Sequence, residues 1–600
     1  MPLVGRSASV TPGPTDREPA GVETANLGPA AGPLDPRAPL SAAQQRWVDS
    51  VHASLTPRQR IAQTVMVWLM GDYSSSDDGA FAAVASLVTG EGVGGIVMSL
   101  GSPGEVATKL NYLQRRARVP LLVGADLEPG LGRLEGGVFV PSLNSAGTAT
   151  VLPSNMAIGA TGSERLARLA GEVTGREALA TGIRLVFAPV VDVNNNPANP
   201  VINVRSFGED PERVATLSAA FVDGVQGAGA AATIKHFPGH GDTDTDSHLA
   251  LPVVKSDMAR LKAVELPPFV RSINAGASAV MTAHVALPAI GGDGTPATLR
   301  PAIMTSLLRD SLGFKGLTIT DALTMQGIGK GYTNEEAVVL ALKAGSDILL
   351  MPTDVPAAIT AVERAVADGS LSPARVEEAV RRVLEWKVRT GSASAPTVSL
   401  DSMREVVGSA RHRALADTIA SAAITLLRDS RSIVPLAASA NVTLVSYASE
   451  SDVSAGRAFA TELRRSYPRA QVVRISPETD AARLEEIARG LRSGATLVVT
   501  THVRTIEGAG RPAVAPSVAT WVDSIARRVP TVVVAHGNPY VVRQFPSVAG
   551  YMVTYGRGDA LERAAARALV GLAPITGQAP VSLPGFFGLG DGLTRGGGRR

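Results

Sequence analysis

Short apolar runs alternate with amphipathic segments over roughly 350 residues of this chain, and this pattern restricts the fold more than any other feature. The apolar runs, which we expect to form buried strands, span residues 93–100, 120–126, 183–193, 230–236, 278–287, 317–321 and 346–351. The amphipathic segments between most of them, which we expect to form helices, include residues 163–181, 211–226 and 334–344. Strands that alternate with helices pair in parallel, and the simplest closed form is an eight-stranded β/α barrel of the TIM type.

An open doubly wound sheet would fit the same periodicity, so the positions of the reactive side chains decide between the two. Acidic, basic and imidazole side chains stand where the expected strands end: Asp126, Asp192 with the following Arg205, Lys235 with His236, His284 and Asp321. In a β/α barrel all of these side chains meet at one mouth. The barrel is therefore the predicted fold, with a site for a neutral, hydroxyl-rich ligand at that mouth.

The alternation starts again in the last third of the chain. Expected strands span residues 441–447, 471–475, 495–501, 530–535 and 550–554, with helices at 411–423, 455–467 and 479–493. This pattern predicts a second, smaller doubly wound α/β sandwich domain. His502 and His536 end two of its strands, and we expect solvated loop residues there rather than substrate contacts.

These patterns predict the domain limits. Residues 1–40, rich in proline and glycine, are expected to form a disordered arm. The barrel is expected at 41–391, beginning with helices near Ser41 and Thr56, followed by a linker at 392–410, the second domain at 411–593 and a disordered tail at 594–600.

Composition excludes several classes of function. The net charge is only +3 over 600 residues, which argues against a nucleic-acid surface, and the chain has no cysteine for disulfides or thiolate chemistry. No stretch is long and apolar enough for a membrane helix, and the apolar start is too short for a secretory signal. The sequence as it begins predicts a cytoplasmic protein, or a secreted or periplasmic one if the true start lies upstream. It predicts no oligomeric state.

Three of the eight histidines fall in one loop of residues 235–248, which reads KHFPGHGDTDTDSH and follows a short apolar run. A loop this dense in titratable groups is typical of a functional site. A glycosidase that retains configuration needs a carboxylate nucleophile and a proton donor. Asp321 suits the first role because it ends a strand. His248 suits the second because Asp246 can bind one ring nitrogen and orient the other.

Three motifs together resemble glycoside hydrolase family 3, in its bacterial β-N-acetylglucosaminidase branch: KHFPGHG with DSH, FAPVVDV with RSFGEDP, and TDALTM. The resemblance implies Asp321 as nucleophile, and His248 oriented by Asp246 as acid/base. It also implies sugar binding by Asp126, Arg205, Lys235 and His236, to which we add Arg133 and His284. The family's usual arginine would stand at position 134, which is leucine here, with Arg133 one residue earlier.

The resemblance implies hydrolysis of terminal β-linked N-acetylglucosamine from peptidoglycan-derived sugars or muropeptides, without metal or organic cofactor. Phosphorolysis and β-glucosidase-type specificity remain open on the same scaffold. A more distant alternative is a metal-dependent hydrolase with His236, His240, Asp242, Asp246 and His248 as ligands. A binding protein that lost turnover is a further alternative, which the presence of Asp321 and His248 disfavours.

Overall fold

The computed structural model describes residues 34–137, 149–290, 294–492, 494–503 and 513–598. The chain enters the fold through two short helices, α1 (Ala42–Ser54) and α2 (Pro57–Ala62). Ser41 and Thr56 each cap a helix through a reciprocal bond with a glutamine three residues later, and Pro57 occupies the first helical position of α2. The predicted helix start at Thr56 is confirmed.

Eight parallel strands form the first domain, in the ring order β7-β6-β5-β4-β3-β2-β1-β8. A bridge between Ile319 and Ile348 joins the two ends of this order, so the sheet closes into the predicted barrel. The strands are β1 (Val65–Met70), β2 (Gly95–Ser99), β3 (Leu122–Ala125), β4 (Leu185–Val186), β5 (Ala231–Phe237), β6 (Ala279–Thr282), β7 (Leu317–Ile319) and β8 (Leu349–Leu350).

The first strand, β1, is absent from the strands that the sequence predicted. Only Gln63 and Thr64 separate it from α2, so no glycine or proline marks its start. A short apolar run such as VMVWLM also does not distinguish a strand from the continuation of a helix. Pairing with β2 and β8 decides the conformation.

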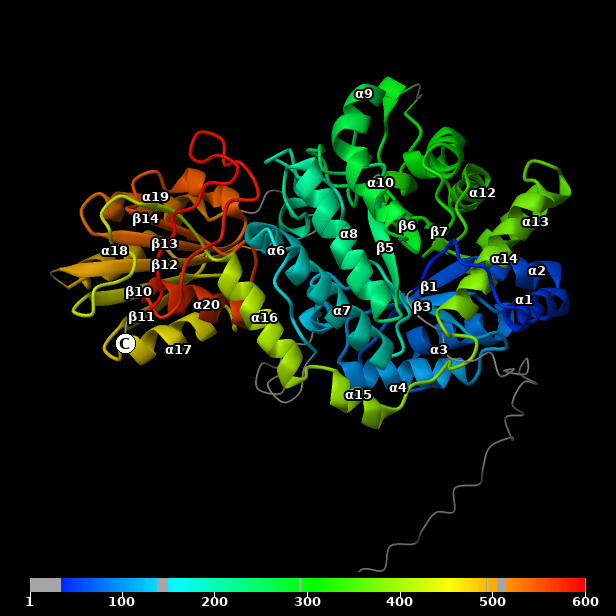
Figure 1. Ribbon diagram of the computed structural model, residues 1–600, viewed down its shortest axis with the longest axis horizontal. Coiled ribbons are helices and arrows are strands. Elements are labelled where there is room, and N and C mark those ends of the chain that lie inside the picture. The colour runs from blue at the N-terminus through cyan, green and yellow to red at the C-terminus, as the bar shows by residue number, and fades with distance from the viewer. Residues whose placement is uncertain (1–33, 138–148, 291–293, 493, 504–512, 599–600) are drawn as a thin grey trace, which may run out of the picture.

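Helices surround the barrel, as Figure 1 shows. The predicted helices at 163–181, 211–226 and 334–344 are confirmed as α7, α8 and α12. The longer helices are α3 (Gly79–Ser86), α4 (Pro103–Gln114), α7 (Glu164–Ala180), α8 (Pro211–Gly227), α10 (Leu266–Asn274), α12 (Asn334–Ala344), α13 (Val355–Ala367) and α14 (Pro373–Arg389). The π-helix η7 (Ala302–Ser311) is of similar length, and shorter helical segments are η1 (Leu87–Glu91), η2 (Leu131–Gly137), α6 (Asn155–Thr161), η3 (Asn203–Arg205), α9 (Met258–Arg260), η4 (Leu261–Glu265), η5 (Pro288–Ile290), η6 (Ala297–Leu299) and α11 (Gln326–Gly329).

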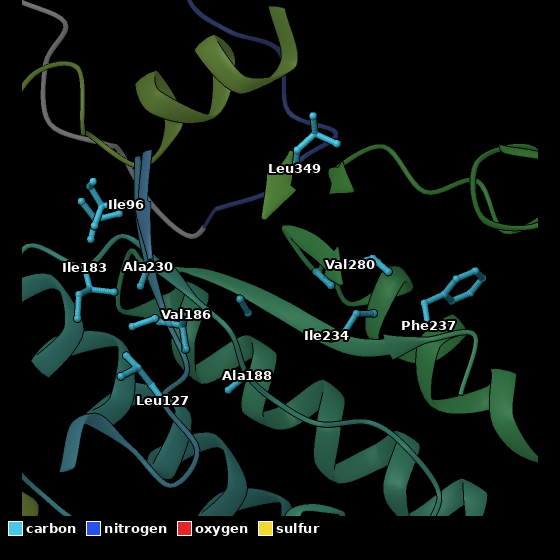
Figure 2. Packing of buried hydrophobic residues seen from close by; sticks show 14 of the residues in the cluster. Ile96, Leu127, Ile183, Val186, Ala188, Ala230, Ile234, Phe237, Val280 and Leu349 are labelled. Atoms are coloured by element: carbon cyan, nitrogen blue, oxygen red, sulfur yellow. The ribbon is translucent and has the colours of Figure 1, made fainter. Parts of the chain in front are cut away.

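The barrel has two apolar layers because successive side chains of a strand point to opposite faces. Val97 and Leu185 belong to the inner cluster, which also contains Trp386 of α14. Their neighbours Ile96 and Val186 belong to the larger cluster that also takes in the surrounding helices, part of which Figure 2 shows. The barrel interior is therefore a packed core of side chains.

The second domain contains a six-stranded sheet in the order β11-β10-β12-β13-β14-β9. The strands are β9 (Thr425–Asp429), β10 (Asn441–Tyr447), β11 (Gln471–Ile475), β12 (Ala495–Val503), β13 (Thr531–Gly537) and β14 (Gly550–Val553). The five predicted strands are confirmed. The sixth, β9, was not predicted, and it joins the sheet antiparallel to β14.

Helices cover both faces of this sheet, which confirms the predicted sandwich. In Figure 1, α19 lies on one side of the strands and α17 and α20 lie on the other. The helical elements of this part are α16 (Ala410–Ala423), α17 (Arg457–Ser466), α18 (Ala481–Arg489), α19 (Pro516–Ala526), η8 (Pro539–Gln544) and α20 (Asp559–Leu569).

The strand-end histidines of this domain are buried, not solvated as expected. His502 and His536 stack with ring centroids 4.6 Å apart, and their rings are enclosed below the surface. Burial lowers the pKa of His536 to about 3. Burial, the neighbouring His536 and Arg474 also lower the pKa of His502. The stacked rings have polar neighbours: Nδ1 of His502 is 3.4 Å from the Glu562 carboxylate, and Nδ1 of His536 is 3.2 Å from the Thr554 hydroxyl.

The ends of the domains differ from the predicted limits. Leu34 is buried, inside the segment 1–40 expected to be disordered; residues 1–33 lie outside the described part. The expected linker 392–410 runs along the barrel, where Asn111 bonds Val398, and it contains the helix α15 (Leu400–Val406). In the expected tail, Arg595 pairs with Ile575.

Along the described ranges, every helix is too short or too polar to cross a membrane.

A buried ion cluster holds the closure of the barrel. Asp347, just before β8, contacts Arg309 at 2.6 Å and Arg375 and Arg382 at 2.7 Å each. The same carboxylate accepts hydrogen bonds from the backbone and hydroxyl of Thr318 in β7. Burial raises the pKa of Asp347, but the three arginines outweigh it and lower that pKa to about 2. Asp347 thus ties both closing strands to the outer helices.

We expect Asp347→Ala to lower the free energy of unfolding of the barrel by about 3–5 kcal/mol, because it removes the buried carboxylate that Arg309, Arg375 and Arg382 share. The native pKa lies below the unfolded value, so this contribution is present at neutral pH and is lost as the pH falls from about 4 towards 2. Calorimetric unfolding measures both effects. Asp401→Ala is the control, since its pair with Arg404 is exposed and we expect a change within about 0.5 kcal/mol. Equal losses in the two variants would contradict the assignment.

Candidate active site

A cavity of about 340 Å³ opens at the carboxyl end of the barrel strands. Its lining comes from the ends of β1, β2, β3, β5, β6, β7 and β8 and from the loops that follow them. The lining residues are Trp68, Val97, Met98, Ser99, Leu100, Asp126, Arg133, Leu134, Val201, Arg205, Lys235, His236, His240, Ser247, His248, Met281, Asp321, Ala322, Thr324, Met325, Leu350 and Met351.

Most of the predicted site residues meet in this cavity. Asp126, Arg133, Arg205, Lys235, His236, His248 and Asp321 line it, although they come from segments almost 200 residues apart. Asp246 and His284 are not part of the lining and stand behind His248 and Asp321. Leu134, at the position where the family's arginine would stand, lines the cavity beside Arg133.

A buried lysine organises one wall. The Lys235 ammonium is 2.5 Å from Asp126 and 2.9 Å from Glu128, and its side chain is only 1% exposed. Arg205 contacts the same Glu128 oxygen at 2.6 Å. A buried ammonium remains charged only when carboxylates face it. The pairing therefore fixes the positions of Lys235 and Arg205 while leaving the Asp126 side chain about half exposed to the cavity.

Glu128 was not among the predicted site residues, although it follows Asp126 by two positions. Burial by itself raises the pKa of this carboxyl, but the charges of Arg205 and Lys235 outweigh that effect and lower the pKa to about 2. One of its oxygens accepts from both cations and the other has no partner within the described residues. The signal in the sequence was the spacing of two acids after one strand, which places both near its end.

A second carboxylate, Asp192, holds the turn after β5. It is 2.7 Å from Nδ1 of His236, and it also accepts the backbone N–H of His236 and of His240. Burial opposes its ionisation, but the two histidines lower its pKa overall. Binding at Nδ1 leaves Nε2 as the ring nitrogen of His236 that faces away from Asp192.

His240 is held differently. Its Nδ1 is 2.8 Å from the hydroxyl of Thr243 and its Nε2 is 3.1 Å from the hydroxyl of Ser247. Burial, followed by the neighbouring His236, lowers the pKa of His240 to about 4. This ring is therefore neutral at physiological pH and packs the loop that carries His248.

His248 and Asp246 form the predicted pair. Nδ1 of His248 is 2.7 Å from an oxygen of Asp246, and the backbone N–H of His248 donates to the same oxygen at 2.9 Å. The Asp246 side chain is 5% exposed and the His248 side chain 30%. A buried carboxylate thus sets the tautomer and orientation of an imidazole at the cavity wall.

Asp321 lies two residues beyond β7. Its carboxylate accepts the backbone N–H of Ala322 at 2.8 Å, and the Thr282 hydroxyl receives the N–H of Asp321. Burial raises the pKa of this carboxyl, but His284, His236, Lys235 and the Ala322 N–H lower it overall. Asp321 is consequently an ionised carboxylate at neutral pH, held by the Ala322 N–H and by nearby basic side chains.

His284 supports this carboxylate from behind. Its Nδ1 contacts Thr298 at 2.8 Å and its Nε2 contacts the carbonyl oxygen of Ala322 at 3.1 Å. Both ring nitrogens are therefore engaged by the protein. His284 therefore lies beside the backbone that follows Asp321 and is not among the residues that line the cavity.

The residues of the metal alternative do not converge on one point. Asp246 and His248 bind each other, His236 binds Asp192, and both nitrogens of His240 face hydroxyls. Across the described ranges, no three His, Asp or Glu side chains are arranged to hold a metal ion. The arrangement is that of paired acids and bases.

The sequence did not indicate the apolar part of the lining. Trp68 lies on β1, the strand that was not predicted, and its side chain is 42% exposed. Met281, Leu350 and Met351 also line the cavity. An aromatic face beside paired charges suits a pyranose ring, which has both apolar C–H faces and hydroxyl edges.

Comparison with known proteins agrees with this architecture. The model of the glycosyl hydrolase family 3 N-terminal domain matches residues 56–386. A beta-N-acetylglucosaminidase/beta-glucosidase of Cellulomonas fimi is 29% identical over 558 residues, which cover 89% of this chain and 95% of that protein. The beta-hexosaminidase A of Pseudoalteromonas piscicida is 32% identical over 442 residues, which cover 66% of this chain and 72% of that protein.

A solved structure has the same layout. The family 3 beta-N-acetylglucosaminidase from Paenibacillus sp. str. FPU-7 matches with a TM-score of 0.77 and 33% identity, covering 88% of this chain and 99% of that one. The family model spans more than half of the chain, and the barrel it describes carries the cavity. The protein is therefore a glycoside hydrolase and belongs to glycosyl hydrolase family 3.

Proposed function

We propose that this protein is a retaining exo-β-N-acetylglucosaminidase that removes terminal sugars from small peptidoglycan-derived substrates. The observation that carries the proposal is the His248–Asp246 pair at the wall of the cavity that Asp321 also lines. Relatives named beta-N-acetylglucosaminidase and beta-hexosaminidase support the choice of sugar.

In the first step, an oxygen of Asp321 attacks the anomeric carbon while the bond from that carbon to the leaving oxygen breaks. His248 donates the proton of its Nε2 to the leaving oxygen. Asp246 stays ionised at Nδ1 and stabilises the imidazole in both protonation states. The products are the free leaving alcohol and a glycosyl ester of Asp321.

In the second step, neutral His248 takes a proton from water as the water oxygen attacks the anomeric carbon. The ester bond breaks, Asp321 leaves as a carboxylate, and the sugar is released with its original configuration. Ionised Asp321 is suited to both steps, because the Ala322 N–H and the nearby basic side chains stabilise the carboxylate as nucleophile and as leaving group.

The remaining polar residues bind the sugar in this proposal. Asp126 accepts hydroxyls, whereas Lys235, Arg205 and Arg133 donate to hydroxyl and carbonyl oxygens. Nε2 of His236 is directed to the substrate because Asp192 occupies Nδ1. His284 acts as a positioning residue for Asp321 and not as a sugar ligand.

We expect Asp321→Ala to lower kcat at least ~1,000-fold while leaving the fold intact, because the change removes the nucleophile from a site that is open to solvent. Mass spectrometry after reaction with a slow fluorinated glycoside checks the role directly, and the label belongs on the peptide that contains Asp321. Asp244→Ala is the matched control: this aspartate is exposed, accepts a hydrogen bond from Thr245 and should retain normal turnover. A label on another residue would rule out the assignment.

We expect His248→Ala to reduce kcat/KM much more for substrates with poor leaving groups than for activated aryl glycosides, with the two losses differing by ~100-fold or more. Only a poor leaving group needs the proton. Asp246→Asn should show a weaker form of the same pattern, since the amide oxygen still accepts from Nδ1 but carries no charge. Kinetics on a series of leaving groups gives the answer, and equal losses throughout would make His248 a binding residue.

We expect an aryl β-N-acetylglucosaminide to be cleaved at least ~100-fold better than the aryl β-glucoside, a difference of about 2.7 kcal/mol in transition-state binding. Buried donors that bond the acetamido oxygen are left unpaired by an analogue that lacks this group, and the unpaired donors weaken transition-state binding. Measurement of kcat/KM for the pair tests the proposal, and comparable values would favour β-glucosidase specificity. The same assay with phosphate added distinguishes hydrolysis, which releases N-acetylglucosamine, from phosphorolysis, which releases its 1-phosphate.

A further inference from the structure

One loop of the barrel, residues 187–210 between β4 and α8, carries several parts of the site. Asp192 near its start holds the backbone of the turn that contains His236 and His240. Val201 and Arg205 further along line the cavity. Asn199 also donates to the carbonyl oxygens of His240 and Gly241. The position of this loop therefore sets one wall of the cavity.

The second domain bonds this loop directly. The amide of Asn194 donates to the hydroxyl of Tyr540 at 2.9 Å, and the amide of Asn203 donates to the side-chain oxygen of Asn538 at 3.3 Å. All four residues are at least nine-tenths buried. Asn538 also accepts the backbone N–H of Tyr540, so the two partners from the second domain form one unit at the end of β13.

The contact continues at the far end of the loop. Gly208 packs so closely that an added Cβ would lie 2.5 Å from the carbonyl oxygen of Pro580. Glu209 accepts the backbone N–H of Ser582 at 2.8 Å and its hydroxyl at 2.5 Å. The loop is consequently held by the second domain at three separate points.

The bonded residues are adjacent to the site residues in sequence. Asn194 follows Asp192 by two positions, and Asn203 precedes Arg205 by two within η3. Asn203 has a φ of +40°, a backbone conformation that non-glycine residues rarely adopt and that its contacts must maintain. Loss of the bond from Asn194 to Tyr540 would therefore displace Asp192, and loss of the bond from Asn203 to Asn538 would displace Arg205.

The cavity contains no side chain of the second domain within the described residues, its most C-terminal lining residue being Met351. We infer that Tyr540 and Asn538 are nevertheless positioning residues for sugar binding, because they hold the loop that presents Arg205 and anchors His236. The inference rests on the proposed function for the identity of the sugar. It assigns the second domain a part in substrate affinity rather than in the chemical step.

The test is Tyr540→Phe, which removes the hydroxyl and keeps the ring. With aryl β-N-acetylglucosaminide, KM should rise about tenfold while kcat stays within about twofold, because residues that bind the ground and transition states equally affect KM. The inhibition constant of free N-acetylglucosamine should rise in parallel. All measurements are made on the full chain, well below the Tm of each variant.

Two further variants make the result specific. Asn194→Ala approaches the same hydrogen bond from the barrel side, and the double variant should bind no worse than either single one, since both remove one interaction. Tyr467→Phe is the matched control: its buried hydroxyl bonds Leu436 and Ala437 inside the second domain, so it should lower stability and leave KM unchanged.

An unchanged KM in Tyr540→Phe, a rise of equal size in Tyr467→Phe, or a loss confined to kcat would each overturn the inference. Failure of the proposed function gives a different result. If the wild type prefers the β-glucoside, the same comparison is made with that substrate, and the positioning role stands or falls on it separately.

Discussion

The parallel pairing of eight strands in a closed ring is the constraint on which the rest of this structure depends. Parallel strands run in one direction, so all of their carboxyl ends lie on one edge, and closure turns that edge into a mouth. Residues as distant in sequence as Trp68 and Met351 therefore line one cavity. Closure itself relies on a buried charge, since Asp347, two residues before β8, joins Thr318 of β7 to arginines of the outer elements.

Charges inside the site occur in complementary sets, and this makes burial possible. Lys235 is almost fully enclosed but faces two carboxylates, while Glu128 faces two cations. Asp192 and Asp246 each hold one nitrogen of a histidine, which leaves the other nitrogen of His236 and of His248 to be directed elsewhere. An isolated charge in such a place would be neutralised by a shift in its pKa. The pairing maintains ionised acceptors and oriented imidazoles at neutral pH, as acid/base chemistry on a neutral sugar requires.

The second domain is bonded to the barrel at a loop that carries part of the cavity wall. Asn538 and Tyr540 directly follow strand β13 of the smaller sheet and bond Asn203 and Asn194. Arg205, near Asn203, lines the cavity, and Asp192, near Asn194, holds His236. Strand ends of an α/β sheet often face a ligand. Here that edge faces another domain, and the buried pair of His502 and His536 beside it packs as core. Among the described residues the cavity lining comes from the barrel, and the second domain reaches the cavity wall through these bonds.

The sequence by itself determined the elements with strong local signals. Periodicity and capping located most strands and helices, and the placement of polar residues after apolar runs identified Asp126, Lys235, His236 and Asp321, because a strand end and its side chain are adjacent in the chain. Asp246 and His248 were also accessible, being two residues apart in one loop. Only the tertiary structure decided β1 and β9, whose strand conformation comes from distant partners. It also decided the bond between Glu128 and Arg205, the enclosure of His284, the burial of His502 and His536, and the contact of Tyr540 with Asn194. These join residues tens to hundreds of positions apart, and no local pattern in a single sequence contains the packing that brings them together.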